Sequence, residues 1–211
     1  ALYDEDNKNV NYGNGTEPVF HINGDPAPDK VLCSTGSLPL HTDGLILGNK
    51  VDVVVLYAAE IGQLNGGETT ICDAKTAIRD MPRDLYEVIR AHECEFVALE
   101  KGYFSKVNGK YSKATKTVNY IDGEEFWQIA MNFLPHEKTA CAGRVAGLEE
   151  SKSTNIMERL RAHFTDPKYF YRHRWTKGDL LLLDNRFCFH GREAFHGSPR
   201  VLYNVNVEFQ V

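Results

Sequence analysis

The chain has 211 residues, of which 42% are hydrophobic, 11% aromatic and 25% charged. This length suits a single domain with a sizeable apolar core. The formal net charge of −5 argues against a nucleic-acid-binding protein, because such proteins usually present a strongly basic face. No apolar run is long enough to predict a membrane span, and the first residues do not form a signal-peptide pattern.

The five cysteines are widely spaced and include no Cys-x-x-Cys pair. We therefore expect reduced thiols in a cytoplasmic protein, rather than a disulfide framework or a structural zinc site. Residues 1–30 are rich in Asn, Asp, Gly and Pro, which predicts a loop-rich segment. We expect residues 1–211 to form one domain whose N-terminal part is incomplete. The sequence leaves open whether the chain forms a homo-oligomer.

Short β-branched and apolar runs predict that much of the chain forms strands. In chain order the predicted strands are 19–22, 51–59, 68–73, 94–99, 103–107, 126–133, 169–175, 179–184, 187–190 and 200–209. The run 126–133 is ambiguous between strand and helix, and Asn108-Gly109 is typical of a hairpin turn.

Three helices are predicted between these strands. They cover 74–80, with Asp73 as N-cap, then 83–92 and 149–164. The last four strands follow one another without a helix. This order favours a mainly β fold with helical insertions, a double-stranded β-helix (a jelly roll of the cupin type) flanked by α-helices.

The run Leu38-Pro-Leu-His-Thr-Asp-Gly contains the first candidate site. Pro39 favours an extended backbone before it, and side chains two apart on a strand point to the same face. His41 and Asp43 would then share a face, with Thr42 on the other. One imidazole and one carboxylate are two ligands of the 2-His-1-carboxylate triad that holds non-haem Fe(II). Taken alone, the pair is a weak signal.

A second run, from Trp175 to His190, offers the third ligand. His190 ends a predicted strand and is followed at once by Gly191. His196 is a rival, but it lies in a turn. Arg200 enters the last predicted strand, and its guanidinium offers a planar fork that binds a carboxylate through two hydrogen bonds.

With these residues in place, the chain resembles the Fe(II)/2-oxoglutarate-dependent oxygenases of the taurine dioxygenase-like superfamily. The resemblance covers roughly residues 35–205. It is carried by Leu38-Pro-Leu-His-Thr-Asp-Gly, Val54-Val-Leu-Tyr-Ala-Ala-Glu-Ile, Gly67-Glu-Thr-Thr-Ile-Cys-Asp and Asp184-Asn-Arg-x-x-x-His. Within the superfamily, Leu56-Tyr-Ala-Ala-Glu-Ile and Leu99-Glu-Lys-Gly-Tyr are most similar to carbapenem synthase.

The resemblance implies a role for each matching residue. His41, Asp43 and His190 would bind iron and form the catalytic centre. Arg200 would pair with the distal carboxylate of the cosubstrate 2-oxoglutarate, and the Thr69 hydroxyl would assist it. The cofactors would be Fe(II), 2-oxoglutarate and O₂. The enzyme would oxidise a small natural-product or amino-acid-derived substrate by hydroxylation, desaturation or ring formation, with release of succinate and CO₂.

Two departures from carbapenem synthase bear on the substrate. Phe104 stands where that enzyme has a tyrosine, and Asn204 where it has an arginine. The resemblance therefore does not imply carbapenem synthesis, and because Asp43 is present it does not imply halogenation. The residues predicted to line the substrate pocket are Tyr103, Phe104, Trp127 and Arg192, although each taken singly is better explained as structural.

Other functions compete with this one. The main alternative is a non-catalytic jelly-roll protein that binds a small molecule. A cupin-type metalloenzyme without a cosubstrate is a third reading, which the position of Arg200 disfavours. Arg186 is expected to pair with an acidic side chain, and Asp184-Asn185 to build the turn before His190.

Overall fold

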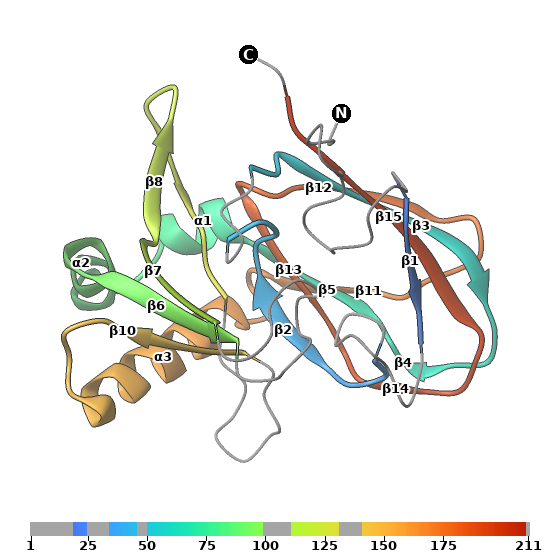
Figure 1. The fold of residues 1–211 in the computed structure, drawn as a ribbon, viewed down its shortest axis with the longest axis horizontal. Coiled ribbons are helices and arrows are strands. Elements are labelled where there is room, and N and C mark those ends of the chain that lie inside the picture. The colour runs from blue at the N-terminus through green and yellow to red at the C-terminus, as the bar shows by residue number, and fades with distance from the viewer. Residues whose placement is uncertain (1–18, 25–33, 46–49, 99–110, 131–140, 210–211) are drawn as a thin grey trace.

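The computed structural model describes residues 19–24, 34–45, 50–98, 111–130 and 141–209. Two four-stranded sheets face each other and form the jelly roll (Figure 1). The first has the strand order β1-β15-β3-β12 and the second β11-β5-β13-β2, and every pairing is antiparallel. The predicted fold class is therefore confirmed.

The first sheet contains the two longest of the described strands. Its strands are β1 (Phe20–Asn23), β3 (Val53–Ile61), β12 (Leu180–Asp184) and β15 (Arg200–Val207). In β15 burial alternates strictly, so that Arg200, Leu202, Asn204 and Asn206 all point inward. Because side chains alternate along a strand, a single strand thus presents one arginine, one leucine and two asparagines to the interior.

The second sheet carries the facing wall. Its strands are β2 (Leu38–His41), β5 (Thr69–Asp73), β11 (Phe170–His173) and β13 (Cys188–Arg192). A cluster of apolar side chains, including Val54, Leu56, Trp175 and Leu202, fills part of the space between the two sheets.

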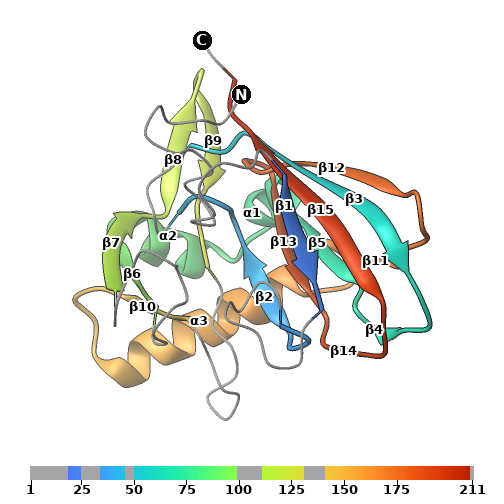
Figure 2. The same ribbon diagram turned by 45° about the vertical axis from the view of Figure 1, so that its right-hand side comes forward.

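A second layer packs beside this sheet (Figure 2). It contains helices α1 (Ala74–Arg79), α2 (Arg83–Ala91) and α3 (Glu150–Phe164), and a three-stranded sheet in the order β10-β6-β7. These strands are β6 (Glu93–Ala98), β7 (Tyr111–Lys116) and β10 (Cys141–Val145). The remaining short strands are β4 (Asn65–Gly66), β8 (Val118–Ile121), β9 (Glu124–Trp127) and β14 (Phe195–His196). The larger apolar core joins α1, α2 and α3 to β6 and to one face of the second sheet.

The predicted helices and most predicted strands are confirmed within a few residues. Asp73 caps α1 as expected, since its carboxylate accepts a hydrogen bond from the backbone N–H of Thr76 at 3.0 Å. The sequence pattern missed β4, β7, β8, β10 and β14. The predicted strand 103–107 and the turn at 108–109 lie outside the described residues, as do residues 131–133. Within the described ranges, no helix is long and apolar enough to cross a membrane.

Candidate active site

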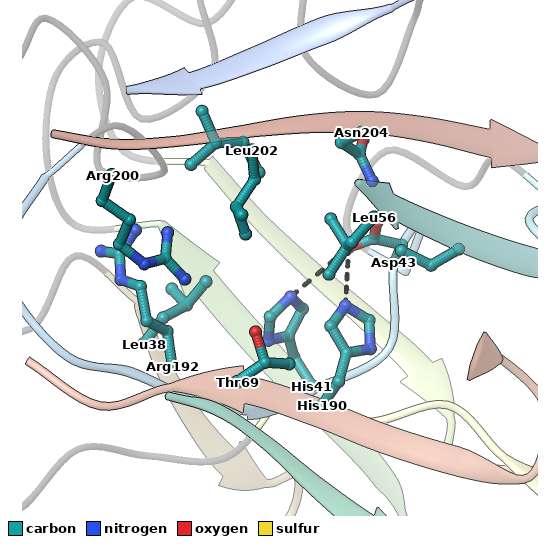
Figure 3. A pocket seen from close by; sticks show the side chains of 13 residues that line it. Leu38, His41, Asp43, Leu56, Thr69, His190, Arg192, Arg200, Leu202 and Asn204 are labelled. Carbon is teal, nitrogen blue, oxygen red and sulfur yellow. Dashed lines mark ion pairs between the residues drawn. The ribbon is translucent and has the colours of Figure 1, made fainter. Parts of the chain in front are cut away.

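A pocket lies between the two sheets of the jelly roll and holds most of the predicted site residues (Figure 3). The empty space among its lining atoms is about 470 Å³, which includes open solvent at its mouth. Its polar residues come from both sheets. They are His41, Asp43, Thr69, His190, Arg192, Arg200 and Asn204. Its apolar walls are formed by Ile22, Leu38, Val54, Leu56 and Leu202.

Strand pairing brings the two histidines together. His41 on β2 lies directly opposite His190 on β13, so both side chains project from the same face of the second sheet. Their ring centroids are 4.5 Å apart. The two histidines are 149 residues apart in the sequence and are brought together by this strand pairing, so neither residue alone indicates the site.

Asp43 also lies beside the two histidines, but it is positioned by hydrogen bonds and not by the predicted strand. Strand β2 ends at His41, so strand alternation does not position Asp43, and that part of the prediction is wrong. Instead Asn185 accepts a hydrogen bond from the Asp43 backbone N–H at 2.9 Å and donates one to its carbonyl at 3.1 Å. Thr42 does point away, as expected, and hydrogen-bonds the backbone of Ile129.

The two oxygens of the Asp43 carboxylate have different neighbours. Its Oδ2 accepts a hydrogen bond from the Asn206 side chain at 2.9 Å. Its Oδ1 lies 3.4 Å from Nε2 of His41 and 3.7 Å from Nε2 of His190. One oxygen is therefore held by the protein, and the other faces both imidazoles.

Burial and these neighbours shift the pKa values of the site. Burial alone would raise the pKa of Asp43, but hydrogen bonds and charge interactions with His190 and His41 hold it well below its usual value. Burial lowers the pKa of His190, and the neighbouring His41 acts in the same direction. An ionised carboxylate beside a neutral imidazole is the protonation state that metal ligation requires.

The three residues fit a metal ion by their chemistry as well as their spacing. Their ligand atoms all lie within 4.8 Å of one another, and they form the only cluster of this kind in the ranges that the structure describes. Nδ1 of His41 lies 2.9 Å from the Pro39 carbonyl oxygen. Because that oxygen can only accept, Nδ1 carries the proton and Nε2 keeps its lone pair for a metal. The set matches the 2-His-1-carboxylate triad of non-haem iron sites.

The Asn206 contact leads to a first prediction. Replacing Asn206 with leucine removes the hydrogen bond that holds Oδ2 of Asp43, so we expect Fe(II) to bind roughly 10- to 100-fold more weakly. Anaerobic Fe(II) titration would measure this loss. Asn119→Leu, in the β8–β9 hairpin, is the matched control and should bind Fe(II) like the wild type. Unchanged affinity in Asn206→Leu would show that Asn206 does not orient the ligand.

The opposite end of the pocket is cationic. Arg200 is 3% exposed and Arg192 is 6% exposed, and both guanidinium groups lie against the ring of Phe195, at 5.1 and 5.7 Å from its centroid. Arg200 donates through Nε to the Gly67 carbonyl oxygen at 3.1 Å. Arg192 donates to Ser34 and to the carbonyl oxygen of Gly36. Two buried cations side by side attract an anion.

The electrostatics of Arg200 agree with this description. Burial lowers the pKa of Arg200 to about 9, and the charge of Arg192 adds to that effect, whereas Glu68 opposes it. The guanidinium therefore remains charged at neutral pH. No carboxylate of the described residues forms an ion pair with it, so its charge stays available to a bound carboxylate.

Thr69 lies between the two ends of the pocket. It pairs with Arg192 across β5 and β13, and it is 3% exposed. In Figure 3 its hydroxyl oxygen points into the space between the arginines and the histidines. The hydroxyl accepts a hydrogen bond from the indole Nε1 of Trp175 at 2.9 Å.

The other predicted site residues are placed differently. Trp127 does not line the pocket: it is fully buried in the core beside the helices, and its indole donates to Glu125 at 2.9 Å. Tyr103 and Phe104 lie outside the described residues. His196 is exposed on β14 and takes no part in the pocket. Arg186 pairs with Asp184 through two hydrogen bonds of 2.9 and 2.8 Å, as predicted.

The sequence pattern did not indicate three supporting residues, Asn185, Asn206 and Trp175. Asn185 was expected only to build a turn, and Asn206 was expected only as part of a strand. Residues 204 and 206 are polar and alternate with apolar residues, and the sequence alone did not show that they point inward. Buried amides of this kind need partners, and here one of those partners is Asp43.

Comparison with known proteins supports the same assignment. Residues 6–206 match the family model described as "Taurine catabolism dioxygenase TauD, TfdA family". A tyrosine isonitrile desaturase of Erwinia amylovora is 27% identical over 93% of this chain and 66% of its own length. An alpha-ketoglutarate-dependent 2,4-dichlorophenoxyacetate dioxygenase of Cupriavidus pinatubonensis is 29% identical over 69% of this chain and 51% of its own length. The chain thus spans less than two thirds of the length of these relatives.

Solved structures confirm the fold. PvcB, an Fe, alpha-ketoglutarate-dependent oxygenase from an isonitrile synthetic pathway, superposes with a TM-score of 0.67 at 21% identity, covering 90% of this chain and 64% of that one. Asparagine oxygenase superposes with a TM-score of 0.66 at 19% identity, covering 92% and 57%. The finer resemblance to carbapenem synthase stays a prediction. The family match covers nearly the whole chain, and the chain belongs to the TauD/TfdA dioxygenase family.

Proposed function

We propose that the protein is a non-haem Fe(II)/2-oxoglutarate-dependent dioxygenase that oxidises a small molecule. The observation that carries this proposal is the division of one buried pocket into a metal-ligating end and a cationic end. A bound Fe(II) with 2-oxoglutarate and O₂ supplies the oxidation of a substrate C–H bond, with release of succinate and CO₂. His41, Asp43 and His190 are proposed to hold the metal.

The protein's own contribution is binding, orientation and exclusion of water. Arg200 and Thr69 are proposed to bind the distal carboxylate of 2-oxoglutarate, because a buried guanidinium and a hydroxyl both donate to a carboxylate. Leu38, Leu56 and Leu202 line the space between the two ends and keep it apolar. When bound ligands displace water from this pocket, each of these charge interactions is strengthened and the reaction is protected from water.

For the substrate we propose a small amino-acid-derived or natural-product molecule. Two relatives are named for tyrosine isonitrile desaturation and another for synthesis of an isocyanoethenyl indole. We therefore place isonitriles derived from aromatic amino acids first among the candidates. Arg192 is the one predicted substrate residue that borders the pocket within the described residues. We further propose a single oxygenase domain that acts in the cytoplasm, and free thiols at Cys72, Cys94 and Cys188 agree with a reducing compartment.

The proposal predicts substrate-dependent succinate release. The protein with Fe(II), 2-oxoglutarate and O₂ should form succinate faster when the correct molecule is present in a panel of aromatic amino-acid isonitriles, amino acids and aryloxyacetates. Product masses then separate gain of one oxygen from loss of two hydrogens. Binding of 2-oxoglutarate without succinate formation from any panel member, under conditions in which a known oxygenase turns over, would favour the non-catalytic binding protein.

A further inference from the structure

Trp175 touches the proposed cosubstrate site without lining the pocket. It lies between β11 and β12 and is 6% exposed. Its Nε1 lies 2.9 Å from Oγ1 of Thr69, and this contact joins positions 106 residues apart in the sequence. Within the described chain, the Thr69 hydroxyl makes no other hydrogen bond.

The chemistry of the pair fixes the direction of this bond. An indole N–H can only donate, whereas a hydroxyl has one proton and two lone pairs. Thr69 must therefore be the acceptor, and its own proton is not used by Trp175. That proton is left for a partner on the pocket side, and a carboxylate, which offers only acceptors, is the complementary partner.

The indole is held firmly enough to impose this direction. It packs in the apolar cluster between the sheets, and it meets the His173 ring edge to face at 4.5 Å between centroids and 89° between planes. Nε2 of His173 lies 3.2 Å from the Asp179 carboxylate, although the two do not form a hydrogen bond. Trp175 is therefore presented to Thr69 before any ligand arrives.

We propose that Trp175 is a positioning residue that fixes the Thr69 hydroxyl as a donor to the distal carboxylate of 2-oxoglutarate. This inference rests on the proposed function. It extends the anion site from the arginine and the threonine to a residue behind them. It also explains why the polar indole edge is turned toward the pocket wall at the boundary of an apolar cluster.

A double-mutant cycle tests the proposal. Anaerobic titration of the Fe(II) protein with 2-oxoglutarate, followed by its visible charge-transfer band, gives the affinity of each variant. Trp175→Phe removes the N–H donor while keeping an aromatic ring at this position, and it should weaken 2-oxoglutarate binding roughly three- to tenfold. Thr69→Val should weaken it by at least as much. In the Thr69→Val background, Trp175→Phe should have no further effect, because its only route to the carboxylate is gone.

The cycle has a matched control and distinct ways to fail. Trp127→Phe removes the other indole of the chain, which donates to Glu125 outside the pocket, and it should leave 2-oxoglutarate affinity unchanged. An equal loss from Trp175→Phe with and without Thr69 would show that the indole acts by packing, and no loss at all would show that it does not act. Either result overturns the inference. Absence of the band in the wild type would instead overturn the proposed function.

A second measurement keeps the test valid if Trp175→Phe fails to fold. The chain contains two tryptophans, so its ¹⁵N-labelled protein gives two indole N–H signals, which Trp127→Phe assigns. With Zn(II) as a diamagnetic substitute, the Trp175 signal should move when 2-oxoglutarate binds, and Thr69→Val should abolish that movement. If the Trp175 signal does not move at saturating 2-oxoglutarate, the proposed link from Trp175 through Thr69 to the bound carboxylate is contradicted.

Discussion

Asp43→Ala should abolish the visible charge-transfer band that the wild-type protein forms with anaerobic Fe(II) and 2-oxoglutarate. The carboxylate is the one anionic group of the metal-ligating cluster, and its Oδ1 faces both imidazoles. Loss of a direct ligand is expected to exceed the roughly 10- to 100-fold cost of losing a supporting contact. Fe(II) affinity should therefore fall by about 100-fold or more, and succinate release should fall with it.

The control for this experiment is another buried carboxylate. Asp52 is 2% exposed and accepts a hydrogen bond from the Phe209 backbone N–H at 2.7 Å, outside the pocket. Asp52→Ala should lower the thermal stability of the protein because it removes that hydrogen bond and the ion pair with Lys50, yet it should keep the band. A band of wild-type intensity in Asp43→Ala would exclude Asp43 from the metal site.

Strands could be predicted from the sequence, whereas most side-chain contacts in the site could not. The run 200–209 is predicted as a strand and forms β15, but its alternation alone would direct the polar side chains of Arg200 and Asn204 toward solvent, whereas the structure places both on the inward face. The mainly β fold followed from many such local patterns, each of which depends on neighbours one or two residues away. Short strands such as β4 and β14, with two residues each, carry no such period and were missed.

The hydrogen bonds that hold the site residues in place could not be predicted in the same way. Asn206 contacts Asp43 across 163 positions of the sequence, Asn185 contacts it across 142, and Trp175 contacts Thr69 across 106. None of these pairs shares a motif or a spacing. Asn206 reaches Asp43 because the two sheets face each other, Asn185 lies in the turn after β12, and Trp175 follows β11, whose register with β5 pairs His173 with Thr69.

Asp43 lies beside the imidazole of His41, as predicted, but for a different structural reason from the one that the sequence suggested. Strand alternation suggested that His41 and Asp43 point together, but the strand ends at His41. Two asparagines keep the carboxylate beside the imidazoles. Asn185 hydrogen-bonds the backbone N–H and carbonyl of Asp43, and Asn206 hydrogen-bonds its side chain. The tripeptide alone therefore does not make the site. Residues from the end of the chain complete it.

Arg200→Met should separate the cosubstrate site from the metal site. It removes a buried cation that is proposed to bind the distal carboxylate, a charge-assisted contact of about 1.5–3 kcal/mol. The affinity for 2-oxoglutarate should fall roughly 10- to 150-fold, whereas Fe(II) affinity should stay within about twofold of the wild type, since no metal ligand is touched. Arg186→Met, which removes a guanidinium paired with Asp184 outside the pocket, should leave both affinities unchanged.

The same substitution should have little effect on stability in the absence of ligand. Burial opposes the charge of Arg200 and lowers its pKa to about 9, so a methionine of similar volume relieves an unfavourable buried cation. Against this gain stands the loss of the hydrogen bond to the Gly67 carbonyl, which contributes about 1 kcal/mol. The melting temperature of the ligand-free protein should therefore change little, while the thermal shift produced by 2-oxoglutarate disappears. A parallel fall in Fe(II) affinity and ligand-free stability would show that Arg200 supports the fold of the pocket rather than binding the carboxylate.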